Sequence, residues 1–418
     1  MSEHMLRFVA LFPAVVALSW IVLGFAFVVR REWRLPRDPA FRPTVAVVIP
    51  AHDEELVLGA AIEALLAQDH PGLQIHVVSD GSTDRTAAIA RGYAPQGVVV
   101  HELIENVGKS AALQHVLDGL DTDLFLVVDA DTRSHPDAIG LLVQQFADPA
   151  VGAVTGHARV GNVESGLTAM QAMEYSVIVG LAKRAEQFWG GLYTVSGAAA
   201  CFRTSALRAV GGWTVETATE DIEVSWRLQR AGWRIAYDPR AVFLIQAPTR
   251  LPALYRQRRR WAQGMVEVLR MHWNVSSTPN RALIPITAQV VGAALWMVLA
   301  TAFLVRAIAG LATGDIGAGS LGPVATSDWY VLLLWTIGLF GLQTSVAALF
   351  DGAYVAGGWR VLPLFLVFPF YFWLVVYPSF VLGAVRGIVS PGSSRWSRTE
   401  RSPVRDTVAV RAPSSRAR

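Results

Sequence analysis

Two aspartates, Asp129 and Asp131, follow an apolar run at 124–128 and are separated by one alanine. If the run is a β-strand, both side chains point toward the same edge at its carboxyl end. Carboxylate oxygens are ligands that Mg²⁺ and Mn²⁺ prefer, and both ions also bind phosphate oxygens. By itself, an Asp-x-Asp sequence is more typical of a turn or a helix N-cap. The pair therefore indicates a divalent-cation site for a diphosphate only if other polar residues gather at the same edge.

Other polar segments follow apolar runs earlier in the chain. His52-Asp53-Glu54-Glu55 follows a run at 44–49, and Ser79-Asp80-Gly81-Ser82-Thr83-Asp84 follows one at 74–78. A further valine-rich run lies at 98–103, and helical patterns separate the runs at 54–68, 83–91 and 109–120. This alternation predicts an α/β fold with a doubly wound sheet, in which ligands bind at the carboxyl ends of the strands. No glycine-rich phosphate loop follows the first run, which argues against NAD-dependent enzymes and P-loop ATPases.

Long runs without charge surround this region. Charged residues make up 17% of the 418 residues, against about 25% in ordinary soluble domains. A basic cluster that includes Arg30, Arg31 and Arg34 follows the first run, so the positive-inside rule places the N-terminus outside and the α/β region in the cytosol. Four charge-free runs are long enough to cross a bilayer as helices, and they lie at 8–29, 282–305, 329–350 and 361–385.

The C-terminal tail conflicts with four crossings. Four spans would return it to the outside, yet residues 386–418 contain eight arginines and only two acidic residues. Either one C-terminal run does not cross, or the tail is exported despite its charge. Three prolines, Pro363, Pro369 and Pro378, make the last run the best candidate for a break. The predicted order is a membrane helix (1–30), a basic linker (31–43), a cytosolic α/β domain (44–250), an amphipathic interfacial region (251–280), three hydrophobic membrane segments (281–388) and a basic, disordered tail (389–418).

Composition excludes several other classes. The single cysteine, Cys201, forms no internal disulfide and is more typical of a small core residue than of a nucleophile. The nine histidines show no zinc-binding spacing. A net charge of +3 is too small to indicate nucleic-acid binding, and we expect no nucleic-acid partner.

The order of the polar motifs resembles that of processive family 2 glycosyltransferases, which include the cellulose, chitin and hyaluronan synthases. Longer stretches, among them 151–156 and 260–264, are similar to the bacterial poly-β-1,6-N-acetylglucosamine synthases. The resemblance implies a GT-A domain inserted between transmembrane α-helices. The most specific motif is Q-x-x-R-W, because non-processive members generally lack it. The matching segments are Asp80-Gly81-Ser82-Thr83-Asp84, Asn106-Val107-Gly108-Lys109, Asp129-Ala130-Asp131, Thr219-Glu220-Asp221 and Gln257-Arg258-Arg259-Arg260-Trp261.

The resemblance implies roles for the residues at the strand ends. Asp80 would bind the uracil or ribose of a UDP-sugar, although an Asx-turn capping the helix near Thr83 would explain it as well. Asp129 and Asp131 would hold the Mg²⁺ or Mn²⁺ that neutralises the departing diphosphate, and Asp129 would also contact the donor. Lys109 would add a cation near the diphosphate, or would be a simple surface lysine.

The resemblance makes Asp221 the general base, which takes a proton from the acceptor hydroxyl as it attacks C1 of the sugar. Direct attack inverts the anomeric centre and gives a β-linked product. Glu220 would face differently on the helix and support the substrate site, through the electrostatics of the helix N-terminus or from behind Asp221. Ser196 and Gly197 would line the acceptor path, although a turn at a strand end would explain them as well. A simple helix start, with Thr as N-cap and acids in the first turn, would also account for the Glu220-Asp221 segment. Asp53 would contact the nucleoside, although the family commonly has asparagine at the matching position.

The segment 251–270 is strongly basic and precedes the second membrane run. Its arginines suit anionic lipid headgroups. A spacing of three also puts Gln257 and Arg260 on one helical face, with Trp261 beside them. We expect these three to point inward, toward the diphosphate and the acceptor sugar, and Arg256 or Arg259 to point toward lipid.

Together, these features predict a processive, inverting glycosyltransferase of the inner (plasma) membrane with a cytoplasmic catalytic domain. The favoured reaction is polymerisation of UDP-N-acetylglucosamine to poly-β-1,6-N-acetylglucosamine, with the growing polysaccharide as acceptor and membrane lipid around the chain. A small membrane accessory subunit or self-association is expected to complete the export path. The alternatives are a chitin-, hyaluronan- or cellulose-type synthase, a non-processive lipid-phosphate glycosyltransferase, and a non-catalytic nucleotide-binding membrane protein.

Overall fold

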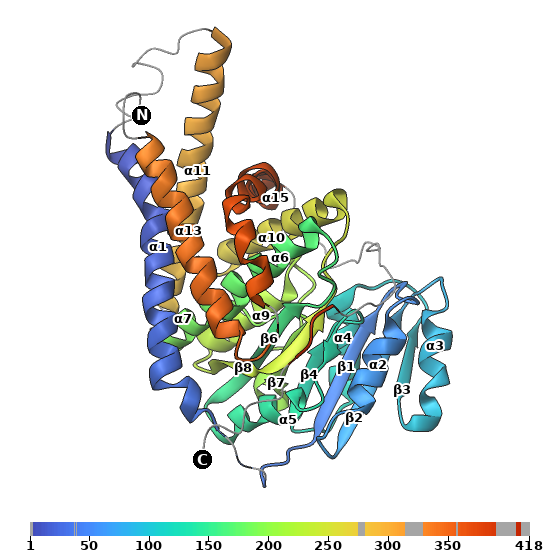
Figure 1. The fold of residues 1–418 in the computed structure, drawn as a ribbon. Coiled ribbons are helices and arrows are strands. Elements are labelled where there is room, and N and C mark those ends of the chain that lie inside the picture. Colours follow the sequence, from blue (N-terminus) through green and yellow to red (C-terminus); the bar gives the residue numbers. More distant parts are fainter. Residues whose placement is uncertain are drawn as a thin grey trace.

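The structure is a computed structural model that describes residues 3–36, 38, 40–274, 281–313, 329–356, 358–389 and 407–410. An α/β domain lies beside three long helices, α1 (Glu3–Arg30), α11 (Leu283–Thr313) and α13 (Trp329–Asp351). Figure 1 shows these helices running side by side and extending beyond the domain at one end. The α/β domain therefore belongs to a chain with a separate helical platform.

The domain is built on an eight-stranded mixed sheet, with strand order β3-β2-β1-β4-β7-β6-β8-β5. The first four strands in sequence are mutually parallel, as the sequence predicts, whereas β7 runs antiparallel to both β4 and β6. The antiparallel strand makes the sheet mixed rather than purely doubly wound. The strands are β1 (Val45–Ala51), β2 (Leu73–Asp80), β3 (Val99–Leu103), β4 (Leu124–Val128), β5 (Arg133–Ser134), β6 (Val151–Val160), β7 (Ala199–Arg203) and β8 (Arg234–Ile245).

Helices cover both faces of this sheet. One buried apolar cluster joins the sheet to α4, α6, α8 and α9, and a second joins the other face to α2, α3 and α5. Cys201 is buried in β7, as expected of a core residue. The helices are α2 (Leu58–Leu66), α3 (Thr86–Gly92), α4 (Lys109–Gly119), α5 (Ala138–Val143), α6 (Gly166–Tyr175), α7 (Ala182–Trp189), α8 (Thr204–Ala209), α9 (Glu220–Arg230) and α10 (Leu251–Met271).

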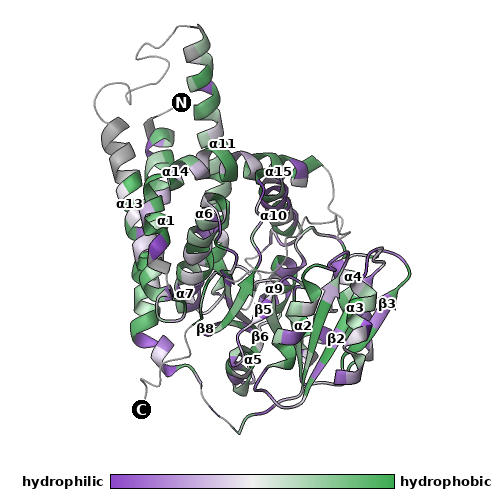
Figure 2. Ribbon diagram, turned by 45° about the vertical axis from the view of Figure 1, so that its right-hand side comes forward, coloured by the Kyte–Doolittle hydropathy of each residue, from purple (hydrophilic) through white to green (hydrophobic). Residues whose placement is uncertain are grey.

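Three segments among the described residues are long and apolar enough to cross a membrane: His4–Arg34, Leu283–Gly310 and Phe368–Val389. The described side chains of α13 form a shorter apolar helix, Ile337–Asp351. Figure 2 shows apolar residues along most of α1, α11 and α13. Several apolar side chains of α1 are exposed, among them Val15, Val22 and Phe25, as a lipid-facing helix requires.

The last apolar run is broken, as its prolines predict. It forms the 3₁₀ segment Gly358–Leu366, α14 (Phe368–Tyr371), the π-helical turn Phe372–Val376 and α15 (Tyr377–Val389). Its second part, Phe368–Val389, is still long and apolar enough to cross a membrane, but the run as a whole is not one straight helix. The physical reason is that proline lacks the N–H that an uninterrupted helix needs. Instead, α15 packs on α10, and Gly383 and Gly387 lie so close to the α10 backbone that a Cβ would stand within 3 Å of it.

A buried charge network joins the long helices to the α/β domain. Asp351, at the end of α13, pairs with Arg159 of β6 and lies 3.2 Å from Nε2 of His157. Arg184 of α7 pairs with Glu32, just beyond α1, through an Nε–Oε2 contact of 2.7 Å. Removing one partner from such a pair leaves an uncompensated buried charge, which typically costs about 3–5 kcal/mol. The network therefore fixes both helix ends against the domain.

The described part of the tail, 407–410, returns to the domain. The backbone N–H of Thr407 donates to the Gly161 carbonyl at 3.1 Å, and its hydroxyl accepts from Val163 N at 2.8 Å. Val410 forms a β-bridge with Val355, just after α13. Val389 still belongs to α15, and the predicted disorder of 390–406 and 411–418 lies outside the described residues.

Candidate active site

Asp80 ends β2 and organises the loop before α4. Its carboxylate is buried and accepts the backbone N–H groups of Val107 and Gly108, each at 2.8 Å. These bonds show that Asp80 holds the loop at 107–108 and does not form the Asx-turn toward Thr83. The next residue, Gly81, has φ 60°, and a Cβ there would lie 2.5 Å from the Asn106 nitrogen, so only glycine allows this approach. Asp80 thereby fixes the position from which Lys109 starts its helix.

Asp53 lies on the neighbouring loop and ties it to the β2 loop. Its φ of 54° is left-handed, and its Oδ1 accepts the Thr83 N–H at 2.8 Å. His52 Nδ1 lies 2.7 Å from the Asp80 carbonyl oxygen, and its Nε2 lies 3.2 Å from the Asn106 amide nitrogen. Both nucleoside candidates predicted from the sequence thus lie on adjacent loops at the carboxyl edge of the sheet. Their contact with a nucleoside stays a prediction.

Lys109 is a buried hub of ion pairs. Its Nζ lies 2.7 Å from Asp129 Oδ1 and 3.0 Å from Glu220 Oε1. It also donates to the Gly197 carbonyl at 3.5 Å. Burial acts to lower the pKa of Lys109, but Asp129 and then Glu220 outweigh it and raise the pKa above its ordinary value. The surface-lysine interpretation is therefore wrong, and the lysine joins three segments that are far apart in sequence.

Asp129 and Asp131 lie immediately after β4. The Asp129 side chain is 31% exposed although Lys109 occupies one oxygen, so it remains open to a ligand. Asp131 is buried, and its Oδ1 accepts the Thr132 hydroxyl at 3.2 Å. Among the described residues, no three His, Cys, Asp or Glu side chains gather as a metal site. Two carboxylates are still a suitable donor set for Mg²⁺ or Mn²⁺, provided that substrate phosphates complete the coordination shell.

Glu220 and Asp221 begin α9 and face the same centre as Lys109. One Asp221 oxygen accepts the Gly197 N–H at 3.1 Å, and the other accepts the Ile222 N–H at 2.9 Å. The predicted N-cap, Thr219, makes no side-chain capping hydrogen bond to this helix. A helix-cap role therefore does not explain why Glu220 pairs with Lys109 and why Asp221 binds the Gly197 loop. A position in the active site explains both contacts.

The two carboxylates differ in acidity. Burial, and then the negative charge of Glu220, raise the pKa of Asp221 to about 6. Burial acts in the same direction on Glu220, but Lys109 and then Arg260 hold its pKa below the ordinary value. A carboxylate with a raised pKa is a stronger base and is still mostly ionised at neutral pH. Asp221 is therefore the carboxylate suited to accept a proton, and Glu220 to remain charged.

Helix α10 brings Arg260 to this centre. Its Nη1 donates to the Ala218 carbonyl at 3.0 Å, just before the α9 start, and its charge acts on both Glu220 and Asp221. Close packing makes this contact possible, because a Cβ on Gly264 would lie 2.1 Å from the Thr219 hydroxyl. Gly264 thus permits α10 to approach α9. Arg260 is itself exposed, and its contact with the diphosphate stays a prediction.

Trp261 is held by a residue whose role the sequence does not reveal, Arg258. The Arg258 guanidinium is buried and lies 4.1 Å from the centre of the Trp261 ring. It pairs with Glu174 of α6 through contacts of 3.0 and 2.8 Å, and Tyr371 donates to the same carboxylate at 2.8 Å. In the sequence, Arg258 is one of four arginines between positions 256 and 260. The signal that distinguishes Arg258 is its spacing of three from Trp261, which places both on one side of the helix.

Tyr175 joins Trp261 to the strand-end carboxylates. The two rings meet edge to face with centres 6.4 Å apart. Burial raises the pKa of the Tyr175 hydroxyl. Arg258 acts to lower this pKa, and the negative charges of Glu174, Asp131 and Asp129 act to raise it. Trp261 therefore lies on the same side of the domain as Asp129 and Asp131, although it comes from a different helix.

The sequence matches the family described as "Glycosyltransferase like family 2" over residues 43–264. The chain belongs to this family. It is 29% identical to the poly-β-1,6-N-acetyl-D-glucosamine synthase of Staphylococcus epidermidis over 310 residues, which cover 72% of this chain and 75% of the relative. It is 31% identical to the synthase of the same name from Staphylococcus aureus strain COL over 307 residues, 71% and 74% of the two chains.

A solved structure shares the fold of this glycosyltransferase. The mannosyltransferase PcManGT from Pyrobaculum calidifontis, in complex with GDP-Man and Mn²⁺, matches with a TM-score of 0.61. The match covers 92% of this chain and 99% of that chain at 19% identity. The predicted GT-A fold, the enzyme class and the family resemblance are thus confirmed. The donor of such an enzyme is a nucleotide sugar.

Two of the remaining predicted site residues of this glycosyltransferase, Ser196 and Gly197, lie on the loop beside Lys109. The backbone N–H of Ser196 donates to the Thr155 hydroxyl at 2.8 Å. A Cβ on Gly197 would lie 3.1 Å from Asp221 Oδ2 and 3.4 Å from Lys109 Nζ, so glycine leaves room beside both groups. Gln257 accepts a hydrogen bond from Arg258 at 2.6 Å, and its expected position near the diphosphate stays a prediction. Arg256 and Arg260 are exposed and Arg259 is half-buried, so the predicted lipid-facing position of Arg256 or Arg259 stays a prediction.

Proposed function

We propose that this glycosyltransferase polymerises N-acetylglucosamine from UDP-N-acetylglucosamine into a β-1,6-linked chain, processively and with inversion. The observation that carries the proposal is the convergence of Asp129, Glu220 and the Gly197 loop on Lys109, with Asp221 held directly beside them. The names of the staphylococcal relatives support the sugar and the linkage.

Asp221 acts as the general base. Its carboxylate is held by two backbone N–H groups, from Gly197 and Ile222, so its orientation is set before the acceptor arrives. It takes the proton of the acceptor hydroxyl as that oxygen forms its bond to C1 and the diphosphate leaves. Lys109 and Arg260 counterbalance the negative charge of Glu220 next to it, which keeps Asp221 from being protonated at neutral pH.

The donor lies over the carboxyl edge of β1, β2 and β4. A divalent cation, Mg²⁺ or Mn²⁺, held by Asp129 and Asp131, would neutralise charge on the leaving diphosphate. Asp80 and Asp53 hold the two loops that face the nucleoside, because their carboxylates accept hydrogen bonds from backbone N–H groups of these loops. The uridine is therefore recognised by the loop backbone as well as by any side-chain contact.

The acceptor end of the polymer lies against Trp261. An indole ring offers a flat apolar surface to the faces of a sugar ring, and the Arg258–Glu174–Tyr371 contacts hold this ring in place. Because α10 carries Trp261 and packs along α15, the site lies next to the C-terminal hydrophobic segments. A polar polymer needs such a protein path to cross the membrane. A small membrane subunit or a second copy of the chain would complete it.

We infer an inner-membrane topology with three crossings, by α1, α11 and α13, in which Phe368–Val389, although long and apolar enough to cross, lies along α10 instead. These helices run side by side, whereas α15 lies along the basic helix α10 (Figure 1). Three crossings with the N-terminus outside bring the tail to the cytosolic side. The bonds from Thr407 to Gly161 and Val163 require the tail to be on the side of the α/β domain. This arrangement removes the conflict between the tail's arginines and the positive-inside rule.

The test is product analysis with membranes that contain the full chain. Membranes are incubated with Mg²⁺ and one UDP-sugar at a time, and the product is digested with hydrolases specific for each linkage. We expect polymer only from UDP-N-acetylglucosamine, sensitive to a β-1,6-specific hydrolase. The Asp221→Asn chain, prepared identically, is the matched control. A chitin- or hyaluronan-type product, or a single sugar transferred to lipid, would overturn the proposal.

A further inference from the structure

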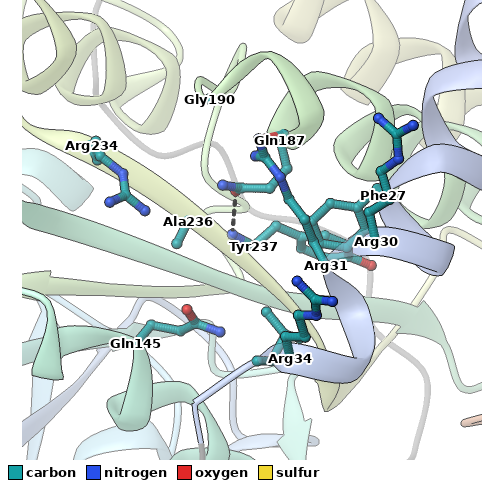
Figure 3. Close-up of a pocket in the computed structure, with 11 residues that line it drawn as sticks. Phe27, Arg30, Arg31, Arg34, Gln145, Gln187, Gly190, Arg234, Ala236 and Tyr237 are labelled. Atoms are coloured by element: carbon teal, nitrogen blue, oxygen red, sulfur yellow. Dashed lines mark hydrogen bonds between the residues drawn. The ribbon is translucent and has the colours of Figure 1, made fainter.

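A cavity of about 640 Å³ lies at the foot of α1, away from the proposed active site. Figure 3 shows it between the end of α1 and strand β8. Four arginines line it: Arg30 ends α1, Arg31 and Arg34 follow, and Arg234 starts β8. A cavity of this size holds a ligand of several hundred daltons.

The charge of the lining is one-sided. No carboxylate lines the cavity, and Arg30 and Arg34 have no acidic partner among the described residues. Arg31 donates to the Gln187 carbonyl at 3.0 Å, and Arg234 pairs with the exposed Asp148 at 2.6 Å. Like charges gathered in a concave site repel each other unless an anion neutralises them. Guanidinium groups pair best with phosphate or carboxylate oxygens.

The rest of the lining is apolar or amide. Phe27, Leu35, Ala236 and Tyr237 form its apolar wall, in which Leu35 is the most exposed, and the Gln187 side chain is held by an N–H donated from Tyr237 at 2.8 Å. A free inorganic anion would leave this apolar surface unused. An amphiphilic anion, with a phosphate next to hydrocarbon, would use both parts of the cavity.

The surroundings of the cavity point to a membrane lipid. The apolar side chains of α1 that lead to it are exposed, including Phe25 (58%) and Val29 (57%). Trp33, in the turn beside the cavity, is 64% exposed, and tryptophan is typical of the level of lipid headgroups. Acyl chains could therefore follow α1 while the phosphate enters among the arginines.

We propose that this cavity is a binding site for the headgroup of an anionic phospholipid of the cytosolic leaflet. The phosphodiester binds Arg31, Arg34 and Arg234, and the glycerol backbone lies against Phe27 and Leu35. The site is separate from the donor and acceptor sites, so it does not depend on which sugar the enzyme transfers.

The test measures lipid binding to the full chain, independently of turnover. Purified protein in a neutral detergent is titrated with phosphatidylglycerol or phosphatidylcholine, and bound lipid is counted by native mass spectrometry. Each arginine near an anionic headgroup contributes about 1 kcal/mol, which is about fivefold in affinity. The pair Arg34→Gln and Arg234→Gln should therefore weaken phosphatidylglycerol binding about 30-fold and leave phosphatidylcholine binding unchanged.

Two further variants separate a built site from general attraction. Arg85→Gln with Arg91→Gln removes the same charge from exposed positions of the α/β domain, away from the membrane helices, and should change the affinity less than about threefold. Arg34→Lys with Arg234→Lys keeps the charge and should retain affinity within about fivefold. Equal losses in the cavity pair and the exposed pair would overturn the proposal. Competition by soluble glycerophosphoglycerol at concentrations equal to the lipid would also overturn it, because the ligand would then be a free phosphodiester.

Discussion

The raised pKa of Asp221 predicts a specific dependence of turnover on pH. With a pKa of about 6, this carboxyl is about 90% ionised at pH 7 and about 10% ionised at pH 5. Because only the ionised form accepts a proton, the rate should fall about tenfold between these pH values. An ordinary aspartate, with a pKa of 3.8, would still be about 90% ionised at pH 5, and the rate would hardly change.

Two variants assign this acid limb to Asp221. Asp221→Asn keeps the size of the side chain but cannot accept the proton, so the rate at pH 7 should fall by about 10²–10⁴ and the limb should disappear. Glu220→Gln removes the neighbouring negative charge that, after burial, contributes most to the raised pKa. The acid limb of the pH profile of Glu220→Gln should therefore move to lower pH, whatever effect this substitution has on the maximal rate.

The assay is the initial rate of UDP release at saturating donor, measured from about pH 4.5 to 8 at constant ionic strength. Asp121→Asn, which neutralises an exposed aspartate outside the site, is the matched control and should reproduce the wild-type profile. Samples held at pH 5 and returned to pH 7 must recover their activity, which separates titration from unfolding. A wild-type limb near pH 4, or an Asp221→Asn chain with more than a tenth of wild-type activity, would refute the role of Asp221 as base.

Three further predictions follow from the geometry of the site. Trp261→Ala removes the surface proposed for the acceptor, so polymer length, measured on gels, should fall far more than UDP release by hydrolysis; equal losses would contradict the acceptor role. EDTA should abolish turnover, and Asp131→Asn should lose activity while still inserting into membranes and folding, as judged by thermal unfolding. Gly264→Ala places a Cβ 2.1 Å from the Thr219 hydroxyl and should cost about 10²-fold in rate by displacing α10; Thr219→Gly in the same chain should restore part of it, and no loss from Gly264→Ala alone would refute the packing argument.

Local sequence patterns predict the elements of the α/β domain well, because each depends on residues close together in the chain. The run at 124–128 is strand β4 with the same bounds, and the segment from Lys109 forms α4 as expected. The helix predicted at 54–68 begins only at Leu58, because the loop before it is tied to the β2 loop by bonds such as that from Glu54 N to Thr86. Hydrogen bonds to a distant loop are not encoded in local periodicity.

In the membrane region, too, the sequence predicts the elements, whereas tertiary packing decides how they are arranged. Charge-free length identified α1 and α11 as candidates for crossing the bilayer, since the cost of burying charge in hydrocarbon depends on composition alone. The prolines of the last run predicted its break. That α15 then lies along α10 depends on Gly383 and Gly387 meeting a helix more than 100 residues earlier in the chain, which only the folded packing decides.

The types of residue in the site were determined by the sequence: two strand-end aspartates, a Glu-Asp pair, one lysine and Q-x-x-R-W. Their division of labour was decided by the tertiary structure. Asp221 and Glu220 are adjacent carboxylates, yet Lys109 pairs with Glu220 and burial raises the pKa of Asp221. Likewise, Arg258 is buried and paired, unlike the neighbouring arginines, because Glu174 and Trp261 surround it in the fold. Charge and burial act through space, so residues with similar sequence surroundings acquire different chemistry once the chain has folded.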